Sequence, residues 1–171
     1  KFLRGIGNIY TDVIRGTPSV TQLMIIYFVV FASVHVDKWI IAAIAFGINS
    51  GAYVSEIIRA GIMSIDKGQT EAGRSLGLNA AQTMSRIIIP QAVKNIFPAL
   101  CNEFIVLIKE TAIVGYVGLM DIQKAGDFIK SATYKPIMPL IATAIIYFVI
   151  IKVLTLLLGL IEKQLRKSEV R

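Results

Sequence analysis

The chain has 171 residues, of which 55% are hydrophobic and 17% are charged, and its formal net charge is +7. So apolar a composition argues against a soluble domain, and no nucleic-acid motif or aromatic and basic stripe accompanies the positive charge. The single Cys101 excludes an intramolecular disulfide and a cysteine metal cluster, and the lone His35 has no second His or Cys with which to hold a metal. The composition therefore predicts an all-α membrane protein with positively charged cytoplasmic loops.

The first part of the chain is expected to hold two membrane spans. Residues 1–10 are mixed and basic, and are expected to lie at the membrane interface. Pro18 has no amide proton and restricts Thr17, so a helix here must break or kink. Residues 20–34, with their flanks, are just long enough for a first span of about 17–25 residues. The apolar run 39–62 opens with a Trp, which suits a membrane interface, and forms the second span.

A polar island, residues 64–98, follows these two spans. Two short helices in it are each predicted to open with a capping box, in which a polar side chain and a Gln three residues later bond each other's backbone: Asp66 with Gln69, and Asn79 with Gln82. Gly77 predicts a left-handed stop after the first helix, and the second helix is expected to run toward Pro90. The island is longer than loops without a role usually are.

The second half of the chain is expected to hold two more spans. Residues 99–120 form one of them, and residues 137–161 form an apolar run, broken only by Lys152, that is long enough to cross with some tilt. The polar segment 121–136 between them is expected to hold a short surface helix. The prediction is four spans, with the island and both ends of the chain on one side.

The Lys and Arg residues set the orientation of these spans. The side that holds the island carries ten of them, whereas the opposite side carries four: Lys38, Lys124, Lys130 and Lys135. Cytoplasmic loops are enriched in Lys and Arg, so the island is predicted to be cytoplasmic.

The island resembles the cytoplasmic coupling loop of membrane permeases in ATP-binding-cassette (ABC) importers. That family's pattern is Glu-Ala-Ala, three residues, Gly, and about nine residues to Ile-x-Leu-Pro. In this chain the pattern stands as Glu71-Ala72-Gly73, Gly77, and Ile87 to Pro90. Gly73 replaces the third-position Ala and Ile89 replaces the Leu, and both changes keep the residue small or aliphatic.

Further motifs extend the resemblance over nearly the whole chain, to the histidine, glutamine and arginine branch of these importers. The matching stretches are Arg15 to Pro18 with Gln22, Asn49 to Ile62, Lys67 to Ala72, and Asn102 to Thr111. The last motif usually continues with Ser, where this chain has Ala112, so any substrate contact of that hydroxyl is missing here. The family has five helices, and its first helix is expected to lie upstream of Lys1, in a longer protein.

The resemblance implies a fold, a function and partners. The fold is a transmembrane helix bundle of the type I ABC importer permease kind, one permease domain over residues 1–171 whose coupling loop is 64–98. The function is ATP-driven import of a polar amino acid across the bacterial cytoplasmic membrane by a multi-pass subunit without a cofactor. The implied partners are an ATPase that binds ATP and magnesium, a second identical or different permease, an extracytoplasmic amino acid binding protein, and lipid. No Gly-x-x-x-x-Gly-Lys-Ser/Thr phosphate loop occurs in the sequence, so the chain itself is not expected to be an enzyme, and no nucleic acid is expected to bind.

The resemblance also implies which residues meet the ATPase. They are Glu71, Ala72, Arg74, Ser75 and Gly77. Glu71 and Arg74 are expected to project from the polar face of a short, capped lever helix. Ala72 and Leu76, at i and i+4, are expected to lie on another face as packing.

Polar side chains at membrane depth mark the candidate pathway, because such groups are expensive in hydrocarbon. The candidate substrate contacts are Asn49, Tyr53, Glu56, Asn102, Glu103 and Thr111. Glu56 and Arg59 are alternatively expected to neutralise each other, and residues 109–111 to form a network between helices. Glu103 has no basic partner at helical spacing in its own span, so it is the best candidate to contact a substrate ammonium or guanidinium.

Charge counting favours a basic substrate. Glu56, Glu103 and Glu110 lie at depth against Arg59 and Lys109, which leaves one surplus carboxylate. A cationic amino acid would stabilise the ionised form through a charge-assisted hydrogen bond. Arginine, lysine or histidine is therefore predicted ahead of glutamine or another neutral amino acid. Two other classes stay open, a membrane anchor that recruits a soluble partner and an ion-driven secondary transporter, although no internal repeats are found.

Overall fold

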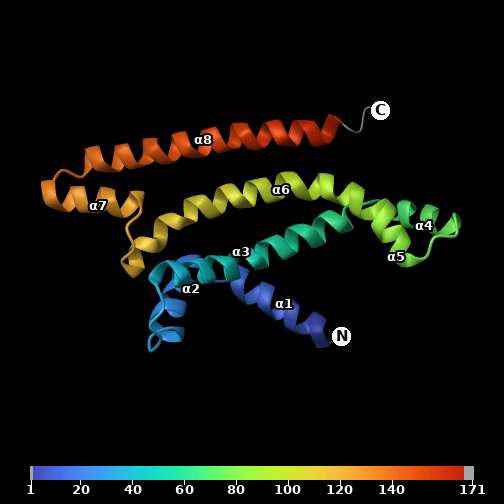
Figure 1. The fold of residues 1–171 in the computed structure, drawn as a ribbon, viewed down its shortest axis with the longest axis horizontal. Coiled ribbons are helices and arrows are strands. Elements are labelled where there is room, and N and C mark those ends of the chain that lie inside the picture. The colour runs from blue at the N-terminus through green and yellow to red at the C-terminus, as the bar shows by residue number, and fades with distance from the viewer. Residues whose placement is uncertain (1, 168–171) are drawn as a thin grey trace.

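The computed structural model describes residues 2–167, and every regular element in that range is helical, as the sequence predicts. The elements are α1 (Phe2–Arg15), α2 (Ser19–Ile25), η1 (Ile26–Val30), α3 (Lys38–Met63), α4 (Lys67–Ser75), α5 (Ala80–Thr83), η2 (Met84–Ile88), α6 (Ile89–Glu110), η3 (Thr111–Val117), α7 (Ile122–Thr133) and α8 (Ile137–Lys167). Of these, η1 and η2 are π-helical turns and η3 is a 3₁₀-helix. In Figure 1, α3, α6 and α8 run along the molecule, with α4 and α5 at one end and α7 at the other.

Two single helices, α3 and α8, are long and apolar enough to cross a membrane. A third candidate span is the pair of α1 with α2 and η1, whose two halves bend by 107°. The break lies where the sequence predicts it, because α1 ends at Arg15 and Pro18 is the N-cap of α2. The predicted first span, 20–34, therefore corresponds to the second half of this bent pair, whose geometry is that of a broken span or a re-entrant loop, and the segment expected to lie at the interface forms most of α1.

The predicted third span, 99–120, is not one helix. Its helix α6 begins earlier, at Ile89, and ends at Glu110, where the chain tightens into η3. The helix expected to run toward Pro90 continues past it, since α5, η2 and α6 follow one another without a break. In the π-helical turn η2, the amide of Ile89 donates a hydrogen bond to the carbonyl of Met84. The next residue, Pro90, has no amide proton, and the wider turn before it lets the helix continue without the hydrogen bond that proline cannot donate.

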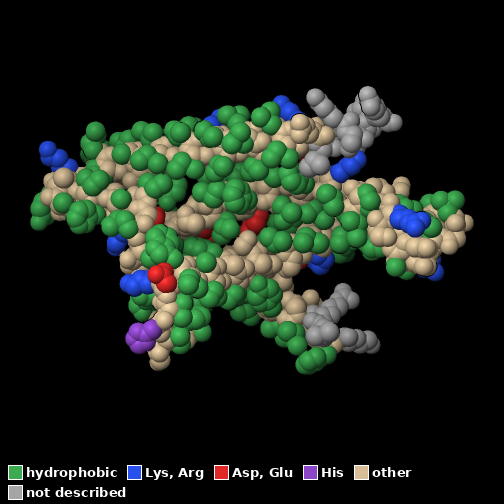
Figure 2. Space-filling view, viewed as in Figure 1, with side chains coloured by type: hydrophobic (Ala, Val, Ile, Leu, Met, Phe, Trp, Pro, Cys, Tyr) green, Lys and Arg blue, Asp and Glu red, His purple; other side chains and the backbone are tan. Residues whose placement is uncertain are grey.

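The buried core gathers at the α7 end, where α2, α3 and η3 meet. Its members are Leu23, Ala42, Ala45, Val114, Val117 and Leu119. By contrast, α8 packs mainly along α6 and α7, and none of its most apolar stretch is buried in the chain. Figure 2 shows hydrophobic side chains over much of the visible face of α8. A surface this apolar suits contact with lipid or another subunit rather than water.

Candidate functional site

The helical hairpin α4–α5 lies at the end of the molecule opposite α7 (Figure 1). The carboxylate of Asp66 caps α4 by accepting a hydrogen bond from the amide of Gly68 at 2.7 Å. The side chain of Gln69 does not return this bond, because its oxygen accepts instead from the Gln91 amide group at 3.2 Å. The predicted capping box is therefore wrong in its second half: Asp66 caps alone, and Gln69 ties α4 to α6.

The second half of the hairpin is built as the sequence predicts. Asn79 Oδ1 accepts from the amide of Gln82 at 2.9 Å, and Gln82 Oε1 accepts from the amide of Asn79 at 3.0 Å, which completes a capping box. Gly77 turns the chain with a φ of +81°, a conformation that favours glycine. A Cβ at Gly77 would meet nothing within 4 Å, so only the backbone conformation demands glycine there.

Gly73 is the residue of α4 that lies against Thr83 of α5 and Ile87 of η2 and so brings the two halves of the hairpin together. It is the buried residue of α4, and a Cβ added to it would lie 2.7 Å from Thr83 Cγ2 and 3.0 Å from Ile87 Cδ1. The family's alanine would therefore not fit without a shift, so Gly73 does more than keep the position small. Leu76, expected to pack with Ala72, is 79% exposed. The five predicted ATPase contacts are all exposed: Glu71, Ala72, Arg74, Ser75 and Gly77.

A buried amide network spans the helix break at Pro18. Gln22 Nε2 donates to the carbonyl oxygens of Ile14 at 2.6 Å and Thr17 at 3.1 Å, on the other side of the break. Gln22 Oε1 accepts from Asn49 Nδ2 of α3 at 2.9 Å. Both side chains are buried, at 8% and 4% exposure. Asn49, a predicted substrate contact, is thus engaged in satisfying the broken helix, as apolar surroundings require.

The acidic face of α6 meets α3. Glu103 is half-buried, and the hydroxyl of Ser50 donates to its Oε1 at 3.3 Å. Glu110 lies two turns further along the same face, beside Ser19 of α2. Within residues 2–167 neither carboxylate forms an ion pair, and the exposed Lys109 pairs with neither of them. Figure 2 shows acidic side chains in the recess between α3 and α6.

Glu56 belongs to a separate, paired cluster where α1 meets α3. Arg59 Nε donates to Glu56 Oε2 at 2.9 Å, and its Nη2 contacts the other carboxylate oxygen. Arg15 Nη1 lies 3.8 Å from the same carboxylate, and its guanidinium lies 5.6 Å from the ring centroid of Tyr53. The predicted pairing of Glu56 with Arg59 is therefore confirmed, and Tyr53 stands against the same cluster.

The two remaining candidates lie apart from these groups. Asn102 is exposed, and the hydroxyl of Thr111 donates to the carbonyl of Ile108 at 2.7 Å within its own turn. Thr111 also lines a largely apolar cavity of about 430 Å³, with Phe46 and Tyr147 among its walls. Glu110 interacts with the side chain of Ser19 of α2, and Thr111 interacts with that of Tyr147 of α8, so these residues make polar contacts between helices, as that alternative expects. The six predicted substrate contacts thus occupy several places rather than one site.

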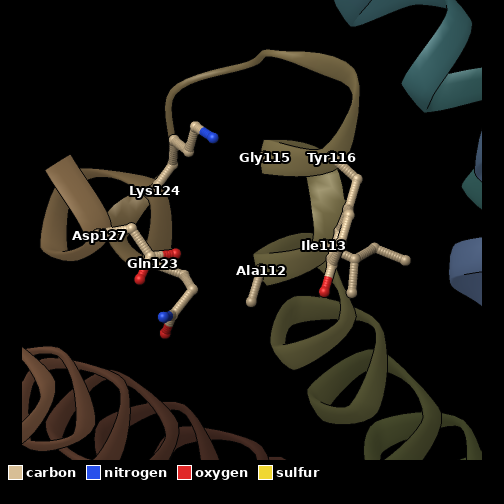
Figure 3. Close-up of a pocket in the computed structure, with 7 residues that line it drawn as sticks. All are labelled: Ala112, Ile113, Gly115, Tyr116, Gln123, Lys124 and Asp127. Atoms are coloured by element: carbon tan, nitrogen blue, oxygen red, sulfur yellow. The ribbon is translucent and has the colours of Figure 1, made fainter. Parts of the chain in front are cut away.

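A second cavity, of about 610 Å³, lies between η3 and α7. Its polar walls are Gln123, Lys124 and Asp127 of α7, which face Ala112 and Gly115 of η3 (Figure 3). Lys130 donates to Asp127 Oδ1 at 2.7 Å and holds the pKa of that carboxyl below its ordinary value. The short surface helix expected in the polar segment 121–136 is confirmed as α7, but the sequence did not indicate the cavity, because it forms by packing of α7 on η3.

Sequence reasoning missed Ser50 and Arg15 as polar partners. In the sequence, Ser50 stands only inside the family motif Asn49 to Ile62, and Arg15 only in the motif Arg15 to Pro18. Their partners lie on other helices, so no spacing within one helix could have indicated them. Gln22 also belongs to one of the family motifs, but its role at the break depends on the packing of α2 against α3.

Comparison with known proteins places the whole arrangement among transport proteins. Residues 1–167 match the family model described as "Binding-protein-dependent transport system inner membrane component". The arginine transport system permease protein of Bacillus subtilis is 45% identical over 96% of this chain and 76% of its own length. A Rickettsia bellii protein, provisionally named a glutamine transport system permease protein, is 44% identical over 96% and 77%. The L-cystine transport system permease protein of Bacillus subtilis is 39% identical over 95% and 70%.

Solved structures agree in fold. A crystal structure of an amino acid ABC transporter with histidines matches at a TM-score of 0.84 and 47% identity, over 92% of this chain and 74% of that one. An inward-facing methionine ABC transporter matches at a TM-score of 0.76 over 95% and 74%. Its identity is only 18%, so that likeness concerns the fold alone.

Proposed function

We propose a substrate and a coupling route for this chain, which belongs to the family of binding-protein-dependent transport system inner membrane components. It is a permease subunit of an amino acid ABC importer and has the type I permease fold. We infer that it works in the bacterial cytoplasmic membrane with a second permease, an extracytoplasmic amino acid binding protein and an ATPase that binds ATP and magnesium. The substrate that the geometry favours is a basic amino acid.

The unpaired acidic face of α6 carries the substrate proposal. Glu56 is already neutralised by Arg59 and Arg15, so these cations are not available to Glu103. Two carboxylates, Glu103 and Glu110, are therefore left without an ion pair in the described chain, one more than the sequence count suggested. A half-buried carboxylate gains from a cationic partner, and a charge-assisted hydrogen bond contributes about 1.5–3 kcal/mol.

Coupling to the ATPase is assigned to the hairpin α4–α5. Its caps and its closure on Gly73 make it compact, and its exposed polar and apolar residues leave a surface for a partner. The helix that leaves it through η2 becomes α6, the helix that carries Glu103. A displacement of the hairpin by the ATPase would therefore act directly on the helix that faces the substrate.

A neutral polar amino acid is the second candidate. Ser50 already donates a hydrogen bond to Glu103, so this carboxylate is not bare, and it can accept from an uncharged amide as well. The relatives are named for arginine, glutamine and L-cystine transport. Both candidates keep Glu103 as a contact and differ in whether its charge is needed.

The test is Glu103→Gln, which keeps the shape and removes the charge. Uptake of labelled arginine or lysine by the reconstituted importer should fall by about tenfold or more, which corresponds to the loss of one charge-assisted hydrogen bond. ATPase subunit binding should stay normal. Asp12→Asn, the same charge change at an exposed position of α1, is the matched control and should leave uptake unchanged.

Undiminished uptake of basic amino acids by Glu103→Gln would rule out Glu103 as the charge contact. Glutamine uptake that is retained in Glu103→Gln would favour the neutral substrate, since the Gln carbonyl still accepts the hydrogen bond and only the charge is lost.

A further inference from the structure

The cavity between η3 and α7 lies at the opposite end of the molecule from the hairpin α4–α5 (Figure 1), and its lining residues (Figure 3) do not include Glu103. Its volume of about 610 Å³ is within the range of about 300–1,000 Å³ in which small-molecule sites fall. Its walls differ in character: η3 supplies apolar side chains and backbone, whereas α7 supplies an amide, an ammonium and a carboxylate.

Lys124 provides an available cation in this cavity. Its stem lies against Gly115, where an added Cβ would meet Lys124 Cδ at 3.2 Å and Cβ at 3.4 Å. Within residues 2–167 its ammonium makes no hydrogen bond or ion pair, and it acts on Asp127 only through space. Figure 3 shows the side chain of Lys124 reaching from α7 into the gap that separates it from Gly115.

Asp127 provides a fixed anion one helical turn away. Lys130 donates to its Oδ1 at 2.7 Å, so Oδ2 can accept from a further donor. Residues at i and i+3 on a helix are neighbours, about 5–6 Å apart at Cβ. The cavity therefore presents a cation and an anion from neighbouring positions on α7, with Gln123, which bonds Asp127, beside them.

We propose that this cavity is an outer binding site for the zwitterionic head group of a free α-amino acid. Lys124 binds the α-carboxylate, Asp127 accepts from the α-ammonium, and the amino acid side chain lies along η3. The site does not include Glu103, and it binds the α-carboxylate and α-ammonium that all free amino acids have. Glu103, by contrast, is proposed to contact the amino acid side chain. The inference rests on the assignment of this chain to an amino acid importer, but not on the charge of the substrate.

Ala112 gives the site a place for specificity. It lines the cavity, and it is the position where the related motif usually has Ser. An apolar methyl in place of a hydroxyl removes a hydrogen-bonding group from the wall that faces the amino acid side chain. Ala112→Ser should therefore change which amino acid is preferred without abolishing the head-group contacts.

The experiment places a reporter in the cavity of the assembled importer in nanodiscs. The variant Cys101→Ser removes the native thiol, and Ala112→Cys introduces one. Its rate of modification by a membrane-impermeant maleimide is measured with and without millimolar arginine, without the binding protein. Arginine should slow the modification severalfold, and agmatine, which lacks the carboxylate, should not.

Three further variants decide the assignment. Lys124→Gln in the reporter background should abolish protection by arginine, whereas Lys135→Gln, the same change at an exposed site outside the cavity, should retain it. Glu103→Gln should also retain it, which separates this site from the proposed substrate contact. Absence of protection, equal protection by agmatine, protection that survives Lys124→Gln, or protection that is lost with Glu103→Gln would each overturn the proposal.

Discussion

The chain interrupts its helices in two places that use opposite chemistry. At Gly77, the hairpin turns with its own local groups: a left-handed glycine, and a capping box between Asn79 and Gln82 three residues apart. At Pro18, the freed carbonyls are satisfied by Gln22, which is itself held by Asn49, 27 residues further along on α3. The first interruption is stabilised by exposed groups, whereas the second has exposed residues at 15–18 but depends on two buried side chains, Gln22 and Asn49.

The comparison teaches that the setting of a helix break decides how it is stabilised. In water, an exposed turn costs little as long as the backbone conformation is allowed. Inside a helix bundle, each freed carbonyl needs a protein partner, because an unsatisfied buried group costs about 1–3 kcal/mol. Substitutions at the two breaks should therefore differ in size and in what they affect.

The largest effect is expected from Gln22→Leu. The change keeps the side-chain volume similar but leaves the Asn49 donor and two carbonyl groups without their partner. The purified importer should lose about 1–3 kcal/mol of stability, seen as a lower thermal unfolding midpoint in detergent. Adding Asn49→Leu should recover part of this loss, since replacing both partners by apolar groups is less costly than stranding one. No loss in the single variant would show that the network is dispensable.

An effect of similar size, but confined to one part of the molecule, is expected from Gly73→Val. Its side chain would overlap Thr83 and Ile87, and such overpacking costs about 1–3 kcal/mol, here confined to the hairpin. Capture of the ATPase subunit and coupled transport should fall, whereas membrane insertion and overall unfolding should change little. Thr70→Val, at an exposed position of α4 outside the five predicted ATPase contacts, is the matched control. Equal loss of ATPase capture in both variants would mean that the surface of α4 matters rather than its closure on η2.

The smallest effect is expected from Gly77→Val, on the order of 1 kcal/mol, because only the left-handed backbone is strained. Gly77→Asn should be nearly neutral, since asparagine tolerates that conformation. ATPase capture should rank wild type, Asn and Val in that order. A Val variant that captures the ATPase as well as the wild type would show that the turn does not hold the coupling surface in place.

Local chemistry is what the sequence by itself determined. The break at Pro18, the caps at Asp66 and Asn79, and the stop at Gly77 each depend on backbone groups within a few residues, so their residue types predict them without knowledge of the fold. The polar island and the apolar runs around it likewise predicted an all-helical membrane protein. The family motifs then pointed to an amino acid permease, which the comparisons with relatives confirm.

Tertiary packing alone decided the rest. Ser50 forms a hydrogen bond with Glu103, 53 residues away in the sequence. Asn49, a predicted substrate contact, instead donates a hydrogen bond to Gln22, which satisfies the carbonyl groups at the break. From the sequence, Gly73 is a neutral replacement of the family's alanine, but the structure shows that Thr83 leaves no room for a Cβ at this position. The end of α6 at Glu110 and the cavity between η3 and α7 have no periodic signal either. In each case the partner is supplied by another element, and hydrophobic periodicity reports which face of a helix is buried but not which side chain lies opposite it.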